Sequence, residues 1–175
     1  MPVIPMKVLT LFFLLLLALP AAASETTPAA QPGATGLPIP RFVSTRSDSV
    51  NVRTGPGERY PVQWVLRKKG MPVEITAEYE NWRKVRDWEG TEGWVHMALL
   101  SGRRNVVIYP SDGVLRNRPD AISRPLARLQ QGVMARIKEC RADWCEISVG
   151  STPTATAGWV NKSSLWGVYP NETIE

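Results

Sequence analysis

The sequence predicts an all-β protein in which two tandem small barrels, each of about five strands, follow a signal peptide and a disordered linker. Three observations support this fold class. The chain beyond residue 41 repeats itself in order. Short runs that alternate apolar and polar residues are separated by Gly, Pro and Asn turn signals. No helical period is sustained beyond the N-terminal apolar run.

Residues 1–23 are expected to be a secretory signal peptide. The apolar run from Val8 to Leu19 follows Lys7 and precedes small residues that form an A-x-A cleavage site. A helix of this run would rise ~18 Å, whereas the hydrocarbon core of a membrane is ~30 Å thick, so a retained membrane span is disfavoured. We therefore expect a periplasmic or secreted protein, with Met6 as an alternative start to Met1.

Residues 24–40 are expected to be a mobile linker. The stretch is rich in Pro, Ala and Thr and nearly free of charge. It holds too little apolar surface to offset the entropy lost on ordering.

The charge of the chain is mildly positive, with 21 Lys and Arg against 16 Asp and Glu, a net charge of +5. The excess is spread almost evenly along the chain. The basic run Arg67–Lys69 lies beside Gly70, where a turn is expected, which favours a solvated loop over a nucleic-acid site. An anionic envelope polymer would still suit a basic surface.

The internal repeat divides the rest of the chain into residues 41–102 and 103–170, with a tail at 171–175. The aligned segments share glycines, tryptophans and alternating apolar positions, with one three-residue insertion. They are Lys69–Ile75 with Gln131–Ile137, Asn81–Val85 with Asp143–Ile147, Gly93–Val95 with Gly158–Val160, and Leu100–Gly102 with Leu165–Gly167.

Each repeat is expected to consist of short strands and turns. In the first repeat, the alternation from Met71 to Ala77 is typical of a half-buried strand. Turn signals at Thr54–Gly57, Asn81 and Glu89–Gly93 separate this strand from the others. The other predicted strands are Val50–Arg53, Trp82–Asp87 and Trp94–Met97.

The first repeat closely resembles a bacterial SH3 (SH3b) domain. Four segments carry the resemblance: Val-Asn-Val-Arg-Thr-Gly-Pro-Gly from Val50, Gly-Met-Pro-Val-Glu-Ile from Gly70, Asn-Trp-Arg-Lys-Val from Asn81, and Gly-Trp-Val from Gly93. The resemblance implies an SH3-like barrel.

The second repeat is similar to the same family, and the pair together resembles the tandem SH3-like proteins that Gram-negative bacteria export. The similarity covers residues 42–102 and 104–170. The second repeat departs from the family pattern at its first loop, where Arg116–Asp120 replaces Arg-Thr-Gly-Pro-Gly.

The chain lacks the residues expected of an enzyme. His96 is the single histidine, so a Cys–His pair or a zinc site with three ligands is hard to assemble. Neither G-x-S-x-G nor H-E-x-x-H occurs. Glu74 and Glu78 would lie ~13 Å apart along a strand, too far for the two carboxylates of a glycosidase. We expect no catalysis, no metal and no cofactor.

Cys140 and Cys145 are expected to form a disulfide, because an even number of cysteines in an exported chain implies pairing. The bond would join the two strands of the central hairpin and stabilise the fold by roughly 2 kcal/mol. The equivalent residues of the first repeat, Glu78 and Arg83, would form an ionic cross-strand pair. The pattern fits either a bulged or a regular hairpin.

The 7 tryptophans supply the candidate ligand contacts. In eukaryotic SH3 domains, a Trp that opens the third strand lines the groove for polyproline-type peptides, and Trp82 and Trp144 are similar to it by position. Most other aromatic residues of that groove are missing, so Arg53, Tyr60 and Trp64 are the candidate replacement walls. Trp82 fits ligand contact and plain packing equally well, whereas Trp94 and Trp159 are expected in the core.

The function expected from these features is that of a non-catalytic exported module. It would bind a peptidoglycan component of the cell wall or an envelope protein. The alternatives are a regulatory partner of an envelope enzyme or receptor, and a cell-wall hydrolase. No nucleic-acid partner and no membrane span after signal cleavage are expected. If one barrel alone binds ligand, we expect it to be the first, supported by the second.

Overall fold

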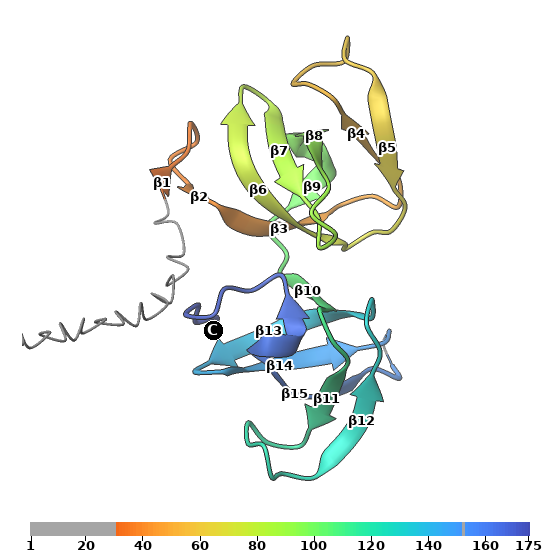
Figure 1. Cartoon of the computed structure of the whole chain (residues 1–175), viewed down its shortest axis with the longest axis vertical. Helices are drawn as coiled ribbons and strands as arrows, with labels where there is room; N and C mark the ends of the chain where they lie inside the picture. Colours follow the sequence, from red (N-terminus) through yellow and green to blue (C-terminus); the bar gives the residue numbers. More distant parts are fainter. Residues whose placement is uncertain (1–30, 152) are drawn as a thin grey trace, which may run out of the picture.

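The computed structural model describes residues 31–151 and 153–175 of the chain. The predicted signal peptide lies outside these residues. The described chain forms two barrels, one above the other, with the first drawn in orange to green and the second in green to blue (Figure 1).

Each barrel is one antiparallel sheet of seven short strands in the same order, β5-β4-β8-β7-β6-β3-β9 in the first and β12-β11-β15-β14-β13-β10-β16 in the second. The strands and 3-10 turns of the first barrel are β3 (Arg41–Thr45), β4 (Val50–Arg53), β5 (Val62–Leu66), β6 (Pro72–Tyr79), β7 (Trp82–Arg86), β8 (Glu92–His96), η1 (Met97–Leu99) and β9 (Leu100–Ser101). Those of the second are β10 (Asn105–Ile108), β11 (Gly113–Arg116), β12 (Pro125–Leu129), β13 (Met134–Arg141), β14 (Trp144–Val149), β15 (Thr156–Asn161), η2 (Lys162–Ser164) and β16 (Leu165–Trp166).

The all-β fold class and the tandem arrangement are therefore confirmed. The four strands that the sequence located in the first repeat correspond to β4, β6, β7 and β8. Three further strands, β3, β5 and β9, complete the sheet. The two residues of β9 are too few to show any periodicity.

Each barrel has its own hydrophobic core. Val50 and Val52 of β4 are fully buried while Asn51 between them is exposed, the alternation expected of a strand with one face inward. The rest of the first core comes mainly from β6, β7, β8 and β9: Val73, Ile75, Val85, Val95 and Leu100. The second core is built by the equivalent positions of the second sheet, with both cysteines included.

The central hairpin carries a bulge in both barrels. The register shifts between Ile75 and Ala77 in β6 and between Ile137 and Glu139 in β13. Beyond the bulge, Glu78 lies opposite Arg83 in the first barrel. Of the two hairpin geometries left open by the sequence, the bulged one is therefore present.

The two cross-strand pairs predicted at the tip of this hairpin are both present. Cys140 and Cys145 are disulfide-bonded, with their Cα atoms 4.1 Å apart. Glu78 Oε1 lies 3.2 Å from Nε of Arg83, and both side chains are almost completely buried. A disulfide in one barrel and an ion pair in the other thus join the same two strands.

At the end of the predicted linker, residues 33–40 contact the first barrel. Thr35 donates its backbone N–H to Oε2 of Glu78 at 2.9 Å, and its hydroxyl donates to the same carboxylate. Arg41 donates to Oε1 of Glu78 at 2.6 Å. The segment is ordered because its polar groups reach a buried carboxylate on β6, a long-range contact that composition does not reveal.

The pKa of Glu78 reflects this environment. Burial raises the pKa of the carboxyl, but the hydrogen bonds from Arg41 and Thr35 outweigh burial and lower it to about 2. Glu78 is therefore a carboxylate at any physiological pH.

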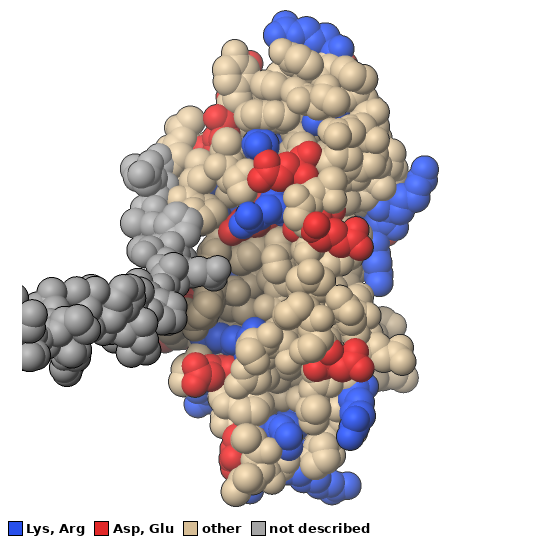
Figure 2. All heavy atoms as spheres, in the orientation of Figure 1, with Lys and Arg blue, Asp and Glu red and all other residues tan. Residues whose placement is uncertain are grey.

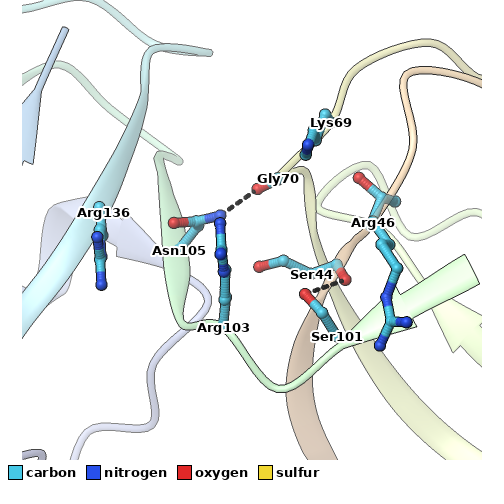
Figure 3. Close-up of a pocket in the computed structure, with 9 residues that line it drawn as sticks. Ser44, Arg46, Lys69, Gly70, Ser101, Arg103, Asn105 and Arg136 are labelled. Atoms are coloured by element: carbon cyan, nitrogen blue, oxygen red, sulfur yellow. Dashed lines mark hydrogen bonds between the residues drawn. The ribbon is translucent and has the colours of Figure 1, made fainter. Parts of the chain in front are cut away.

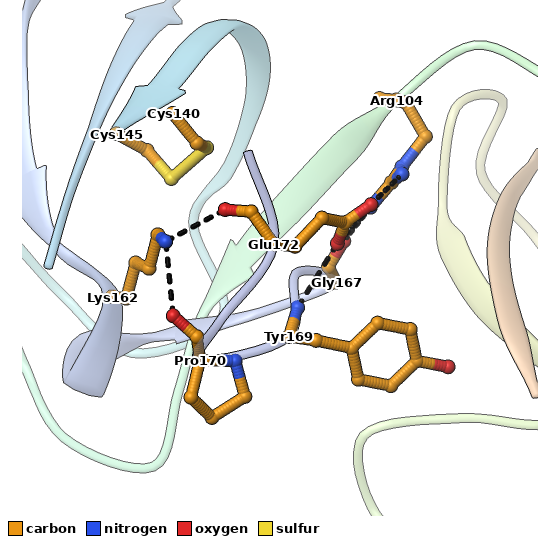
Figure 4. The surroundings of a disulfide bond; sticks show 8 residues. All are labelled: Arg104, Cys140, Cys145, Lys162, Gly167, Tyr169, Pro170 and Glu172. Atoms are coloured by element: carbon orange, nitrogen blue, oxygen red, sulfur yellow. Dashed lines mark hydrogen bonds and ion pairs between the residues drawn. A yellow bond between two sulfur atoms is a disulfide. The ribbon is translucent and has the colours of Figure 1, made fainter. Parts of the chain in front are cut away.

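The C-terminal segment covers the hairpin of the second barrel in a comparable way. Ile174 exchanges backbone hydrogen bonds with Cys140, at 2.8 and 3.1 Å. The buried Lys162 donates from Nζ to the carbonyls of Pro170 and Glu172, at 3.0 and 2.7 Å (Figure 4). The tail at 171–175 is thus held by the backbone of β13 and by a buried cation.

Arg104 ties the same segment to the start of the second barrel. Its guanidinium donates to Oε2 of Glu172 at 3.0 Å and to the carbonyl of Gly167 at 2.9 Å (Figure 4). Burial raises the pKa of Glu172, but the hydrogen bonds from Arg104 and from the backbone of Tyr169 give a net lowering.

The two barrels pack against each other through an aromatic contact. Phe42 of β3 meets Trp166 edge-on at 4.9 Å between ring centroids, and it meets the ring of Tyr169 at 4.7 Å. The hydroxyl of Tyr169 donates to Oε1 of Glu74 at 2.8 Å. Glu74 lies on the outward face of β6 and is nevertheless only 3% exposed. The second barrel therefore buries a surface of the first and fixes their relative orientation.

Candidate ligand-binding surfaces

Trp82 opens β7 and is only 9% exposed. Its ring lies edge-on to that of His96, with centroids 5.4 Å apart. His96 in turn accepts the backbone N–H of Ala98 through Nδ1, at 3.3 Å, and so caps η1. In this arrangement Trp82 packs within the barrel and offers a ligand little area.

Arg53 and Tyr60 shape the long loop between β4 and β5. Arg53 donates to the carbonyls of Glu58 and Tyr60, at 3.0 and 2.7 Å. The ring of Tyr60 lies over Gly55, where an added Cβ would lie 2.5 Å from Cδ1 of the ring. The glycine is therefore needed for the close approach, and both predicted residues hold the loop together.

Trp64 lies on β5 and lines a surface hollow of about 400 Å³. Trp88, from the β7–β8 connection, lines the same hollow. Arg53, Tyr60 and Trp82 do not line it, so the structure does not gather the predicted residues of the first repeat into one groove.

Trp88 was missed by the sequence analysis. The offset that aligns Trp82 with Trp144 places Trp88 opposite Gly150 of the second repeat. An aromatic residue present in one copy and absent from the other is not required by the shared fold. The difference between Trp88 and Gly150 could therefore have marked Trp88 as a candidate ligand contact.

Trp144 opens β14 and is half-buried, more accessible than its counterpart Trp82. It lines a hollow of about 240 Å³ together with Arg116 of β11, Asn161 and Ser164. Asn161 takes the place of His96 at the start of its 3-10 turn, and its Oδ1 accepts the backbone N–H of Ser163 at 3.0 Å. Each barrel therefore has a hollow with an aromatic wall, but at different places.

Two further properties concern the described residues. Within 31–151 and 153–175, no helical segment combines the length and apolar character that a membrane crossing requires. In the same ranges, His, Cys, Asp and Glu side chains do not gather in groups of three or more that could hold a metal ion. Figure 2 shows acidic and basic side chains interspersed on the face drawn.

Comparison with known proteins places this geometry in a family. Residues 46–102 and 110–167 each match the family described as Bacterial SH3 domain. The chain is also 27% identical over 126 residues to the "Putative N-acetylmuramoyl-L-alanine amidase YrvJ" of Bacillus subtilis (strain 168), a match that covers 66% of this chain and 23% of that protein.

Among solved structures, the chain is similar to one described as NlpC2 from Trichomonas vaginalis, with a TM-score of 0.33 and 10% sequence identity. The similarity covers 73% of this chain and 48% of that chain, and its TM-score is too low to support functional inference. The two family matches, in contrast, take up more than half of the sequence. The chain therefore belongs to the bacterial SH3 domain family and contains the domain twice.

Proposed function

We propose that this protein is a non-catalytic exported module that binds a peptidoglycan component of the cell wall. The observation that carries the proposal is the tandem pair of bacterial SH3 domains, each with an accessible hollow walled by tryptophan. Bacterial SH3 domains commonly serve as cell-wall-binding modules. The name of the Bacillus subtilis relative refers to a bond between N-acetylmuramic acid and L-alanine, which is a peptidoglycan linkage.

The chemistry of the hollows fits such a ligand. An indole ring offers a flat apolar face to a sugar ring and an N–H group at its edge. The first hollow adds Arg67, Asp87 and Glu89 around its two indoles. The second adds Arg116 and Asp112 beside Trp144. Each hollow thus combines an apolar wall with both signs of charge, as a polymer of sugars and charged peptides requires.

Two sites on one chain also suit a repetitive polymer. The aromatic and hydrogen-bonded contacts between the barrels hold the two hollows in a fixed relation. Once one hollow is occupied, the second meets its ligand at a high effective concentration. Modest affinity at each hollow then suffices for firm attachment.

Export to the periplasm or beyond the cell is part of the proposal. The N-terminal signal motif supports it, and the Cys140–Cys145 disulfide suits an oxidising compartment. The absence of catalysis is also proposed. Nδ1 of His96 accepts the backbone N–H of Ala98 and its ring packs against Trp82, so the single histidine has a structural role that supports this proposal.

The deciding experiment is a pull-down of the purified protein on isolated sacculi. We expect retention of the wild type, because its two hollows are intact. A stacked aromatic contributes about 1 kcal/mol, so binding should weaken roughly thirtyfold when Trp64→Ala and Trp88→Ala are combined and roughly fivefold for Trp144→Ala. Tyr79→Ala is the matched control, since Tyr79 is an exposed aromatic that lines neither hollow.

Failure of the wild type to bind sacculi would exclude the cell wall as the ligand. Stoichiometric co-purification of an envelope protein would then favour the alternative role as a regulatory partner. Clearing of a sacculus suspension by the purified protein would contradict the non-catalytic assignment.

A further inference from the structure

A cleft of about 360 Å³ lies at the junction of the two barrels (Figure 3). It shares no lining residue with either tryptophan hollow. One side of the cleft comes from the first barrel, from β3, β9 and the turn before β6. The other side comes from the second barrel, from β10, β13 and the connection that precedes β10. The cleft therefore exists only while the barrels are packed together.

Two cross-strand pairs face each other across this cleft. Ser44 of β3 lies opposite Ser101 of β9, and Asn105 of β10 lies opposite Arg136 of β13. Residues directly opposite in neighbouring strands project on the same side of a sheet, so each pair presents its side chains together. Nδ2 of Asn105 donates to the carbonyl of Gly70 at 2.8 Å, which joins the two sides.

The cleft is strongly basic. Four cations line it: Arg46, Lys69, Arg103 and Arg136. Among the described residues that line it, none is acidic. The carboxylate of Asp48 lies nearby and accepts the backbone N–H of Lys69 at 3.2 Å, so it offsets one of the four charges. A concave surface with net positive charge concentrates anions.

The floor of the cleft contains an unpartnered hydroxyl. Ser44 is fully buried, and its Oγ has no hydrogen-bond partner within the described chain. Its carbonyl oxygen is engaged, because Ser101 donates to it at 3.3 Å. Figure 3 shows the hydroxyl directed toward the side where Arg103 and Asn105 lie. A buried hydroxyl without a partner is costly, and a ligand oxygen in the cleft would satisfy it.

The repeated fold does not require these cations. The turn before β6 has its equivalent before β13, because Asp48 accepts the N–H of Lys69 and Asp112 accepts the N–H of Gln131. Neutral Gln131 thus takes the place of Lys69. Arg46 donates its backbone N–H to Leu99, and its equivalent is the uncharged Tyr109, which donates its backbone N–H to Ser164. The shared fold therefore requires neither Arg46 nor Lys69.

We propose that this cleft is a further binding site, specific for an oxyanion, which is a carboxylate or phosphate group of an envelope molecule. The guanidinium groups would donate paired hydrogen bonds to the anion, and the Ser44 hydroxyl would donate a further one. The cations are solvent-exposed, so binding weakens as salt rises. This site goes beyond the aromatic hollows and is independent of them.

The test is an NMR titration of the purified protein with sodium pyrophosphate or citrate at low ionic strength. We expect shifts of the amides of Ser44, Gly70 and Asn105. Combining Arg103→Gln with Arg136→Gln should weaken binding at least tenfold, since charge-assisted hydrogen bonds contribute roughly a factor of ten each. Ser44→Ala should weaken it severalfold without loss of thermal stability.

Arg128→Gln is the matched control, because Arg128 is an exposed arginine of β12 that does not line the cleft. Equal weakening by Arg128→Gln, or no shift at the junction in the wild type, would overturn the proposal. The Trp64→Ala and Trp144→Ala variants should retain anion binding, which separates this site from the proposed cell-wall function.

Two larger probes distinguish the source of the oxyanion. Soluble muropeptides with free carboxylates, compared with their amidated forms, test a peptide ligand. Phosphatidylglycerol vesicles, compared with phosphatidylcholine vesicles, test a lipid phosphate. Arg103→Gln combined with Arg136→Gln should weaken whichever interaction is observed at least tenfold.

Discussion

Glu78 shows most directly how one side chain organises its surroundings. Its carboxylate accepts hydrogen bonds from Thr35 of the N-terminal segment and from Arg41 at the start of β3. It also forms an ion pair with Arg83 across the hairpin. Taking a carboxylate out of water is unfavourable unless several donors replace the water, and here three residues do so. Strict alternation from Ile75 would put Glu78 on the other face of β6, whereas the bulge places it opposite Arg83, on the same face as Val85. The sequence does not predict that the end of the linker would contact this carboxylate.

We expect Glu78→Gln to destabilise the protein by about 2 kcal/mol at pH 7, because it weakens charge-assisted hydrogen bonds to buried donors. The wild type should also lose stability as the pH falls from the carboxyl pKa of an unfolded chain, ~4.3, toward the folded pKa of about 2. The folded form binds fewer protons in that range, so acid favours unfolding.

Urea denaturation at pH 7 and at pH 3 measures both effects. The variant should lose less stability between the two pH values than the wild type does. Glu92→Gln is the control, since Glu92 forms a half-exposed pair with Lys84 and should change little. An unchanged pH dependence in Glu78→Gln would show that Glu78 does not carry the acid sensitivity.

The bulged central hairpin is the element in which the two copies differ most in chemistry. The same two positions hold an ion pair in the first barrel and a disulfide in the second. The repeat alignment predicts this equivalence, since it places Glu78 on Cys140 and Arg83 on Cys145. Hydrophobic alternation alone could not locate the bulge, because either register keeps Ile75 in the core.

Loss of the disulfide is expected to loosen the C-terminal segment. Replacing both Cys140 and Cys145 by Ala should lower stability by roughly 2 kcal/mol, as for a short loop. Because Ile174 pairs with the backbone of Cys140, its amide should lose protection against hydrogen exchange.

Reductant should lower the melting temperature of the wild type and leave that of the alanine variant unchanged. Amides of β6 and β7, in the other barrel, serve as the internal reference. If the Ile174 amide stays protected in the variant, the segment is held by Lys162 and Arg104 rather than by the hairpin.

At the scale of the whole molecule, the packing of the barrels determines what the sequence could reveal. Two copies, their strands and their separate cores follow from patterns within each repeat. Contacts between repeats leave no such pattern: Glu74 occupies an outward-facing position, yet Tyr169 covers it. The same holds for the basic cleft, whose cations come from four separate stretches of chain.

The pairing of Tyr169 with Glu74 makes the junction sensitive to alkali. Burial, followed by the hydrogen bond and the negative charge of Glu74, raises the pKa of the Tyr169 phenol well above its usual value. A raised phenol pKa favours the packed state at neutral pH, and this contribution is lost as the pH rises beyond the ordinary pKa of ~10.

We therefore expect an ultraviolet titration to show one of the 4 tyrosines still protonated when the exposed ones have ionised. Phe42→Ala removes the aromatic contact and should return the pKa of Tyr169 to ~10 while both barrels stay folded. Tyr169→Phe should remove the late ionisation step from the titration and so assign it to Tyr169. Ordinary titration of all tyrosines in the wild type would show that the barrels do not remain packed in solution.

The hairpin tips have a consequence for the two ends of the chain. The N-terminal stretch is held by a carboxylate that acid can neutralise, whereas the C-terminal stretch rests on a backbone edge that a disulfide keeps in place. Acidification toward the pKa of Glu78, about 2, would therefore weaken the attachment of residues 33–41. It would weaken the C-terminal segment as well, because Glu172 needs its charge to bind Arg104 strongly. Thiol reduction would loosen the C-terminal segment alone, so the two attachments differ in their response to redox conditions.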